Sequence, residues 1–399
     1  MGSIISLDIG KFQLDWGKNG LFVDYSALFQ KNDLKMENHY YANDVVVEQE
    51  ALSSPLSKVK KRLNLLGYTL KSVRQTYNFF KKEHAAYSSK KILLSFEEFF
   101  EILKGIEIDK IKIRKMDKDY WESDFGKYVS WIIAQKMHVT NFKTWVVSVG
   151  AFFESLDPLL IIRILSENPK NIKENIVWRF HDVLEGGYIE KNDVLRGPEE
   201  SIKYLIVTEG STDLFVIRKA LELFHPEIID FFHFIDMQDN YPFTGCSNLY
   251  KFLLGLSKVR PINKVVAIFD NDTAGNEQFN LCKKAVLPSN IKITKLPEVS
   301  IFKRFLTEGP TGKKIKNING TAVSIECFLD LNYKVSGSPI VRWASYNERM
   351  NSYQGSLEQK EKYVRIFKGV RLKSKYDFSK IKVLCEHIIN SCRNFDEKY

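Results

Sequence analysis

The second half of the chain alternates short apolar runs with longer segments of helical periodicity. Four of the runs are rich in β-branched or aromatic side chains: residues 204–208, 229–236, 265–269 and 291–296. Such runs are typical of strands buried in a sheet. Between them, apolar residues recur at helical spacing, as Leu214, Ile217 and Leu221 do. The alternation predicts an α/β fold with a mostly parallel sheet and right-handed crossovers.

The first half of the chain has a different pattern. Residues 3–10 and 21–25 are strand-like and flank turn residues at 16–20, which predicts a β-hairpin. From about residue 55 to residue 180 the apolar spacing becomes helical. We therefore expect a mainly helical N-terminal domain that opens with a β-hairpin.

Glycine and proline near residue 197 mark the boundary between the two patterns. The chain is long enough for two or three domains. We expect three parts: an N-terminal hairpin with a helical region at 1–197, an α/β domain at 198–332, and a helical extension at 333–399.

Two of the predicted strands end abruptly in acids. Glu209 follows the run at 204–208, Asp270 follows the run at 265–269, and Asp213 and Asp272 come close behind. The carboxyl ends of parallel strands meet at one edge of a sheet, where four acids would repel one another without a cation. Taken singly, each segment also fits an ordinary helix N-cap or turn. Together, about 60 residues apart as two βα units require, they favour a magnesium or manganese site.

These acids resemble the signature of the Toprim superfamily, the metal-binding α/β domain shared by topoisomerases, primases and several nucleases. That signature is a strand ending in Glu-Gly, then a strand ending in Asp-x-Asp with a glycine nearby. Glu209 with its following glycine matches the first element, and Asp270 and Asp272 with Gly275 match the second. The resemblance implies a Rossmann-like Toprim domain for this part of the chain.

Further residues resemble the nucleases of the overcoming-lysogenization-defect (OLD) type. In that group an acid four residues after the glutamate joins the metal shell, as Asp213 would, and a later Ile-Glu element supplies another ligand, here Glu326. The group also places a lysine after that element to neutralise charge in the transition state. Lys360 is the corresponding residue, although Arg342 or Arg365 would serve the same electrostatics. If Lys360 is not the residue that matches the lysine of that group, it is an ordinary exposed lysine on a helix.

Five acids are more than one magnesium ion takes from a protein, because the ion keeps several waters. Two ions about 4 Å apart would stabilise both the attacking and the leaving oxygen of a displacement at phosphorus. Glu209 is then either a metal ligand or the general base, and the sequence leaves both roles open.

Other segments resemble proteins labelled HEPN/Toprim-associated: residues 14–19, 342–347 and 353–357. With the acids, they extend the similarity over most of the chain. Proteins of this group resemble effectors of bacterial anti-phage systems, and the same N-terminal region is attached elsewhere to HEPN ribonuclease-like domains. The resemblance implies that the N-terminal half senses or binds a target, and that a partner protein of a defence system takes part.

The formal net charge of +10 and the pI near 9.1 favour an acidic partner, and beside a carboxylate site that partner is nucleic acid. The glycine-punctuated segment 310–320 contributes Lys313, Lys314 and Lys316 just before Glu326. It is either a lid over phosphates or a solvated loop. It lacks the phosphate-binding motif of nucleotide triphosphatases, so we reject that class.

The sequence does not fit several classes of protein. No apolar stretch reaches the length of about 18 residues that a membrane span needs, and the start of the chain lacks a secretory signal, so we expect a cytosolic protein with no membrane contact. The five cysteines are odd in number and include no Cys-x-x-Cys pair, which argues against zinc fingers and disulfide scaffolds. Whether the chain forms a homodimer is left open.

These patterns favour a magnesium-dependent endonuclease that cleaves phosphodiester bonds in DNA or RNA, and the resemblance implies that it acts as an anti-phage effector. A topoisomerase needs a strand-passing gate for which this length has little room, and a primase often needs a zinc ribbon. The alternative is a sensor of nucleic acid or of a phage trigger whose acids hold a structural cation. The choice between DNA and RNA is open, because no recognition motif for either is readable.

Overall fold

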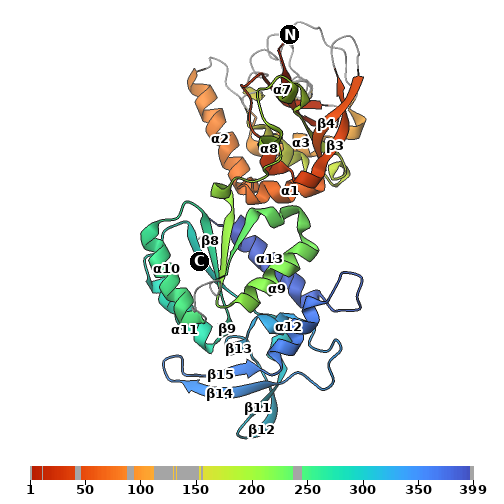
Figure 1. Cartoon of the computed structure of the whole chain (residues 1–399). Coiled ribbons are helices and arrows are strands. Elements are labelled where there is room, and N and C mark those ends of the chain that lie inside the picture. The colour runs from red at the N-terminus through yellow and green to blue at the C-terminus, as the bar shows by residue number, and fades with distance from the viewer. Residues whose placement is uncertain are drawn as a thin grey trace. The chain divides into compact units, whose positions relative to one another are not determined.

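In the computed structural model, the chain forms two compact units, Met1–Glu199 and Glu200–Tyr399 (Figure 1). The structure describes residues 2–10, 12–40, 46–87, 94–111, 129, 132, 152–153, 156–236 and 245–395. Each unit buries a hydrophobic core of its own.

The first unit contains a five-stranded antiparallel sheet with the order β2-β1-β5-β4-β3. Its strands are β1 (Ile4–Ile9), β2 (Phe12–Lys18), β3 (Leu34–Tyr40), β4 (Val46–Pro55) and β5 (Asn175–Arg179). The prediction of a mainly helical domain was wrong in this respect. In the centre of the sheet Leu7 pairs with Trp178, and a pairing between such distant positions leaves no local pattern in the sequence.

A hairpin does open the chain, but it pairs β1 with β2, so the predicted second strand at 21–25 was wrong: apart from an isolated bridge between Lys18 and Leu21, that segment is not a strand. Gly10 adopts a φ of 58°, a left-handed conformation that favours glycine, and it connects β1 to β2. Trp16, which we expected in the turn, lies inside β2 and pairs with Ser6. An aromatic side chain that packs on a pleated surface here outweighs the nearby glycines as a structural signal.

Helices pack with this sheet and supply a large share of the first unit's core. They are α1 (Leu56–Leu65), α2 (Leu70–Tyr87), α3 (Phe96–Lys104), α6 (Pro158–Leu165), α7 (His181–Glu185) and α8 (Lys191–Val194). The ring of Tyr77 stacks on that of Phe99 with centroids 4.7 Å apart, and it meets Phe152 edge to face. The helical periodicity predicted for this region is therefore present in the described segments.

The second unit is built around a parallel sheet with the order β10-β8-β6-β7, as the alternating pattern predicted. Its strands are β6 (Tyr204–Thr208), β7 (Phe232–Ile235), β8 (Lys264–Phe269) and β10 (Ile291–Lys295). The connecting helices are α9 (Ser211–Phe224), α10 (Cys246–Val259) and α11 (Thr273–Lys284). Each strand and helix occurs close to the position that its apolar periodicity indicated.

The rest of the second unit adds a mixed sheet with the order β12-β11-β14-β15 and a two-stranded pair, β13 with β9. The strands are β9 (Asn271–Asp272), β11 (Phe305–Gly309), β12 (Gly312–Lys316), β13 (Ala322–Val323), β14 (Val341–Asn347) and β15 (Ser352–Leu357), and the helices are α12 (Lys360–Lys368) and α13 (Ser379–Arg393). Two expectations change as a result. Segment 310–320 begins with the turn and the second strand, β12, of a β-hairpin. The C-terminal segment contains two strands before its helices.

The two C-terminal strands were not predicted because their position depends on a long-range contact. β14 is held in place by parallel pairing with β11, Thr307 being paired with Val341, and such a long-range contact is not visible in a local window. Within the described residues, no helix has both the length and the apolar character needed to cross a membrane. All five cysteines are free thiols.

Candidate active site

Two acids meet where neighbouring parallel strands end. β6 ends at Thr208 and β8 at Phe269, and Thr208 pairs with Ile268, so the two strand ends are level. The residues that follow, Glu209 and Asp270, are directly connected. The backbone N–H of Asp270 donates to Oε1 of Glu209 at 2.9 Å. The buried strands thus deliver both acids to the carboxyl edge of the sheet.

Asp213 comes to the same edge on the first turn of α9. Gly210 precedes this helix, and its backbone N–H donates to Oδ2 of Asp213 at 3.1 Å. An acid in the first turn of a helix is stabilised by the exposed N–H groups and the positive end of the helix dipole. The bond holds the carboxylate back toward Glu209, the residue before Gly210.

Asp272 caps the N-terminus of α11. Its Oδ1 accepts from the N–H of Gly275 at 2.7 Å, and its Oδ2 accepts from Nε2 of Gln354 at 2.6 Å. Gly275 is required by space, because a Cβ there would lie 2.4 Å from the carbonyl oxygen of Asp270 and 3.1 Å from Oε1 of Glu209. The glycine therefore allows α11 to begin directly against the strand-end acids.

Glu326 and Lys360 complete the group. Glu326 lies in the 3₁₀ turn Ile325–Phe328 and is 7% exposed, and Ser324 Oγ donates to its Oε2 at 2.6 Å. Lys360 is the first residue of α12, and its Nζ lies 3.5 Å from Oε2 of Glu326. We call the five carboxylates the acidic cluster: Glu209, Asp213, Asp270, Asp272 and Glu326.

Electrostatics tie these residues into one group. Burial, followed by the negative charges of Asp272 and Asp213, raises the pKa of Glu209 to about 8. Burial and the charge of Glu326 raise the pKa of Asp213 to about 7. Burial and the neighbouring carboxylates hold the pKa of Asp270 well above its ordinary value. Acids with such raised pKa values are typical of sites that bind a cation or transfer a proton.

The acids of the cluster also change the pKa of Lys360. Burial lowers its pKa, but the carboxylates of Glu326, Asp270 and Asp213 outweigh burial and raise the pKa above its ordinary value. Arg342, an alternative from the sequence, instead bridges Glu308 and Glu358 on the mixed sheet. Among the residues that the structure describes, Lys360 is the cation whose charge acts on Glu209, Asp213, Asp270 and Asp272, and a single positive charge cannot balance five carboxylates.

The donor set of the cluster suits a hard divalent cation, because every candidate ligand is a carboxylate oxygen. Within the described ranges, no three His, Cys, Asp or Glu side chains are already arranged around a point that could hold a metal ion. Binding would therefore require the carboxylates to rotate toward a shared ion. Glu209 and Asp213 each use one oxygen for a backbone N–H, which leaves the other oxygen for such a ligand bond.

The three lysines of segment 310–320 do not join the cluster. They lie on the exposed strand β12, where Lys313 pairs with Glu308 and Lys314 pairs with Thr307 of β11. Gln354, which donates to Asp272, was not predicted as a site residue. Gln354 lies 82 positions from Asp272, on a strand that was itself not predicted, so no local signal identified it.

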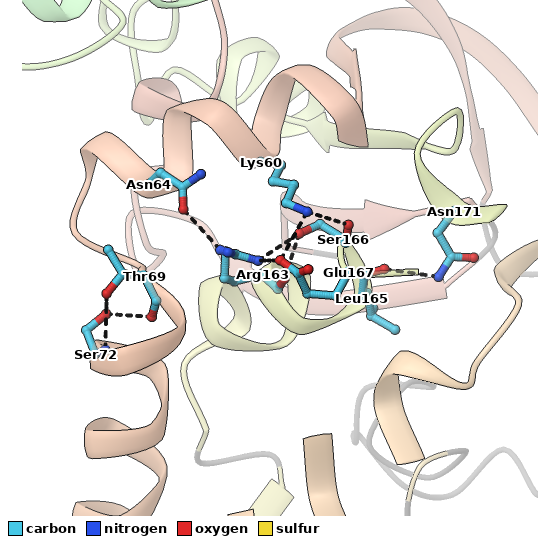
Figure 2. Close-up of polar contacts among 9 residues, drawn as sticks. All are labelled: Lys60, Asn64, Thr69, Ser72, Arg163, Leu165, Ser166, Glu167 and Asn171. Atoms are coloured by element: carbon cyan, nitrogen blue, oxygen red, sulfur yellow. Dashed lines mark hydrogen bonds and ion pairs between the residues drawn. The ribbon is translucent and has the colours of Figure 1, made fainter. Parts of the chain in front are cut away.

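In the first unit, two cations of α1 are held by contacts within that unit. Lys60 contacts Glu167 at 3.0 Å and donates to the carbonyl of Ser166 at 3.2 Å (Figure 2). Arg62 is buried and donates to the carbonyls of Ala27 and Phe29. These contacts give the two cations structural roles.

A family model described as HEPN/Toprim N-terminal domain 1 matches residues 1–201. The match spans the whole first compact unit and ends just inside the second. No curated protein and no solved structure matches the chain. The acidic cluster lies outside the matched residues, so its interpretation depends on its own geometry and charge.

Proposed function

The chain belongs to the HEPN/Toprim N-terminal domain 1 family, and from this membership and the acidic cluster we propose that it is a metal-dependent endonuclease with a Toprim domain of the OLD type. The observation that carries the proposal is the contact between the N–H of Asp270 and Oε1 of Glu209. It joins the ends of two parallel strands at the edge where α/β folds bind ligands. The net charge of +10 favours a polyanionic substrate.

In this proposal the acidic cluster holds two magnesium or manganese ions. When bound, the ions would neutralise charge on the scissile phosphate and on the oxygens that attack and leave. Lys360 would place a further positive charge beside the phosphate, since its Nζ already lies 3.5 Å from Glu326. Glu209 would serve as a ligand or would take the proton of the attacking water, and its raised pKa suits a residue that exchanges protons near neutral pH.

The biological role in this proposal is that of an effector in anti-phage defence. The match of the N-terminal half to a family named for both HEPN and Toprim supports a nuclease-type protein of this kind. The N-terminal unit would then recognise the trigger or a partner protein, and the second unit would cut DNA or RNA. A protein in the cytosol is the expected setting, and a homodimer remains compatible with it.

The test is cleavage of single- and double-stranded DNA, tRNA and mRNA with magnesium or manganese. Wild type is compared with the double variant Asp270→Ala/Asp272→Ala and with Glu361→Ala, an exposed acid on α12 outside the cluster. We expect wild type and Glu361→Ala to cleave, and the double variant to be inactive while it stays folded. Full metal-dependent cleavage by the double variant would show that the cluster is not the active site.

A silent wild type would be informative as well. If no substrate is cut but magnesium still raises the melting temperature, the acids hold a structural cation and the chain is a binding protein or sensor. The double variant should then lose the magnesium-dependent rise.

A further inference from the structure

A groove of about 480 Å³ lies on one face of the mixed sheet in the second unit. Figure 1 shows this sheet as the strands β11, β12, β14 and β15, next to the short strands β9 and β13. The groove is lined by side chains and backbone from all four strands and their loops, among them Thr307, Lys314, Lys316, Trp343 and Tyr353. Two of its lining residues are lysines and none is acidic.

The register explains why only some of the basic residues reach the groove. Side chains alternate between the two faces of a strand, so Lys314 and Lys316 share a face of β12 and Lys313 lies on the other. On the opposite face, Lys313 lies across from Glu308 in the register of the two strands, and Arg342 forms an ion pair with Glu308. The groove face thus keeps its positive charge, while the other face balances it.

Trp343 forms the floor of the groove. Its indole lies across two neighbouring glycines, because a Cβ at Gly309 would come within 3.2 Å of the ring and a Cβ at Gly355 within 3.1 Å. Nζ of Lys316 lies 5.6 Å from the centre of the indole ring. Tyr353 stands beside this floor with 56% of its surface exposed. The sheet therefore presents aromatic rings and lysines together on one face.

Three short hydrogen bonds join β15, whose residues line the groove, to Asp272 and its neighbours. Thr273, which follows Asp272, donates its hydroxyl to the carbonyl of Tyr353 at 2.8 Å. Gln354, the next residue on β15, bonds Oδ2 of Asp272. The N–H of Gly355 donates to the carbonyl of Thr321, a lining residue next to the strand that pairs with Asp272. One end of the groove is consequently fixed beside the acids.

We propose that this groove binds single-stranded nucleic acid and leads it to the acidic cluster. Lysines in a groove without acids attract the phosphate backbone, and an exposed ring offers a face on which a base can stack. In a duplex the faces of the bases are already stacked on one another, so only an unpaired strand can use Tyr353 in this way. The inference rests on the proposed nuclease function and specifies the form of its substrate.

The test measures binding without any metal, so that it does not depend on cleavage. Fluorescence anisotropy in EDTA follows the full chain binding to labelled dT12, to U12 and to a DNA duplex of the same length. The variants are Lys314→Ala/Lys316→Ala and Tyr353→Ala. Their matched controls are Lys313→Ala, on the other face of the same strand, and Tyr353→Phe, which keeps the ring.

We expect single strands to bind more tightly than the duplex. The logarithm of the association constant falls with the logarithm of the salt concentration. In the double lysine variant this slope should be shallower by about 1.4, because two phosphate contacts are lost at about 0.7 each. Tyr353→Ala should weaken binding about tenfold, the effect of one lost base stack, while both controls bind like wild type. Equal or tighter binding of the duplex, or an equal loss with Lys313→Ala, would overturn the inference.

The same proteins separate this inference from the proposed function. If single strands bind through the groove but wild type cuts nothing, the nuclease proposal fails and the groove stands. If wild type cuts nucleic acid and the groove variants bind and cut like wild type, the nuclease stands and the groove assignment is wrong. If none of the three probes binds, the groove has another occupant and the inference is wrong.

Discussion

Two glutamates, one in each unit, show how differently the units treat a partly buried acid. In the first unit, burial raises the pKa of Glu167, but Arg163 and Lys60 outweigh burial and hold the pKa below its ordinary value (Figure 2). In the second unit, burial and neighbouring carboxylates raise the pKa of Glu209 to about 8, although the N–H of Asp270 opposes them. Burial alone therefore does not mark a functional acid; a shortage of compensating cations does.

The surroundings of the two glutamates extend this contrast. Glu167 belongs to a network in which Arg163 also bonds Asn64 at 3.2 Å and the hydroxyl of Ser166 at 3.3 Å. These bonds fix α6 against α1 and leave the arginine satisfied. In the acidic cluster, several carboxylates share one lysine, and the missing positive charge is what a bound cation would supply. The comparison predicts opposite responses when each group is altered.

The largest effect is expected at the cation of the cluster. Lys360→Met should lower the rate of cleavage about 100-fold, as the loss of one charged group that stabilises the transition state does in other enzymes. The rate is measured under single-turnover conditions, with magnesium saturating. Lys362→Met is the matched control, because Lys362 lies on the same helix and its Nζ donates to Oε1 of Gln359 at 3.3 Å rather than to an acid of the cluster. An equal loss in both variants would show that Lys360 has no special role.

The second effect concerns stability rather than chemistry. Glu167→Gln should reduce the free energy of unfolding by about 2 kcal/mol, since it leaves the buried Arg163 without its ionic partner. Cleavage of nucleic acid should remain at the wild-type rate. Urea denaturation measures the loss, with Glu185→Gln, an exposed glutamate of α7, as the control. A strong loss of cleavage by folded Glu167→Gln would place function in the first unit.

The same contrast explains what the sequence could show. The strands of the parallel sheet and the acids at their ends were readable because each βα unit is local, so a buried run and the acid after it stand side by side in the chain. The five-stranded sheet was missed because β5 pairs with β1 across most of the first unit. Whether the acids hold metal stays a prediction, because charge compensation depends on side chains that only folding brings together.

Two examples show where prediction from the sequence ended. Asp272 was predicted at the strand edge, but its partner Gln354 comes from a strand that only long-range pairing stabilises. Lys313, Lys314 and Lys316 were predicted as one basic group, yet the pleat of β12 separates Lys313 from the other two. A period of two is readable in a strand only once the segment is recognised as a strand.

The third prediction concerns pH. Protons must leave Asp213 and Glu209, with pKa values of about 7 and 8, before their oxygens can bind a cation. Magnesium affinity should therefore rise about tenfold per pH unit for each proton released, between pH 6 and pH 8. Isothermal titration calorimetry in two buffers of different ionisation enthalpy measures both the affinity and the protons. An affinity independent of pH would mean that these acids are not ligands.

In the metal-free protein, Asp213 and Glu209 should make the free energy of unfolding fall as pH rises, whereas the magnesium affinity rises. The folded-state pKa values lie above the ordinary values of 3.8 and 4.5, so the folded protein holds more protons than the unfolded chain in this range. The stability that these protons provide is present at low pH and is lost as pH rises from about 4 to about 8. Magnesium should remove most of this loss.

The smallest effect is a gain in stability, and it is judged against the same change, aspartate to asparagine, in the other unit. Asp8 is a buried acid paired with Arg179, so Asp8→Asn should destabilise the protein by leaving that arginine uncompensated. Asp270→Asn should do the reverse at pH 8 in EDTA and stabilise the protein by about 1 kcal/mol, because it removes one of several repelling carboxylates. Calorimetric melting of both variants measures the two signs. If Asp270→Asn also destabilises the metal-free protein, the cluster is already balanced without a cation, and the reason to expect one there is lost.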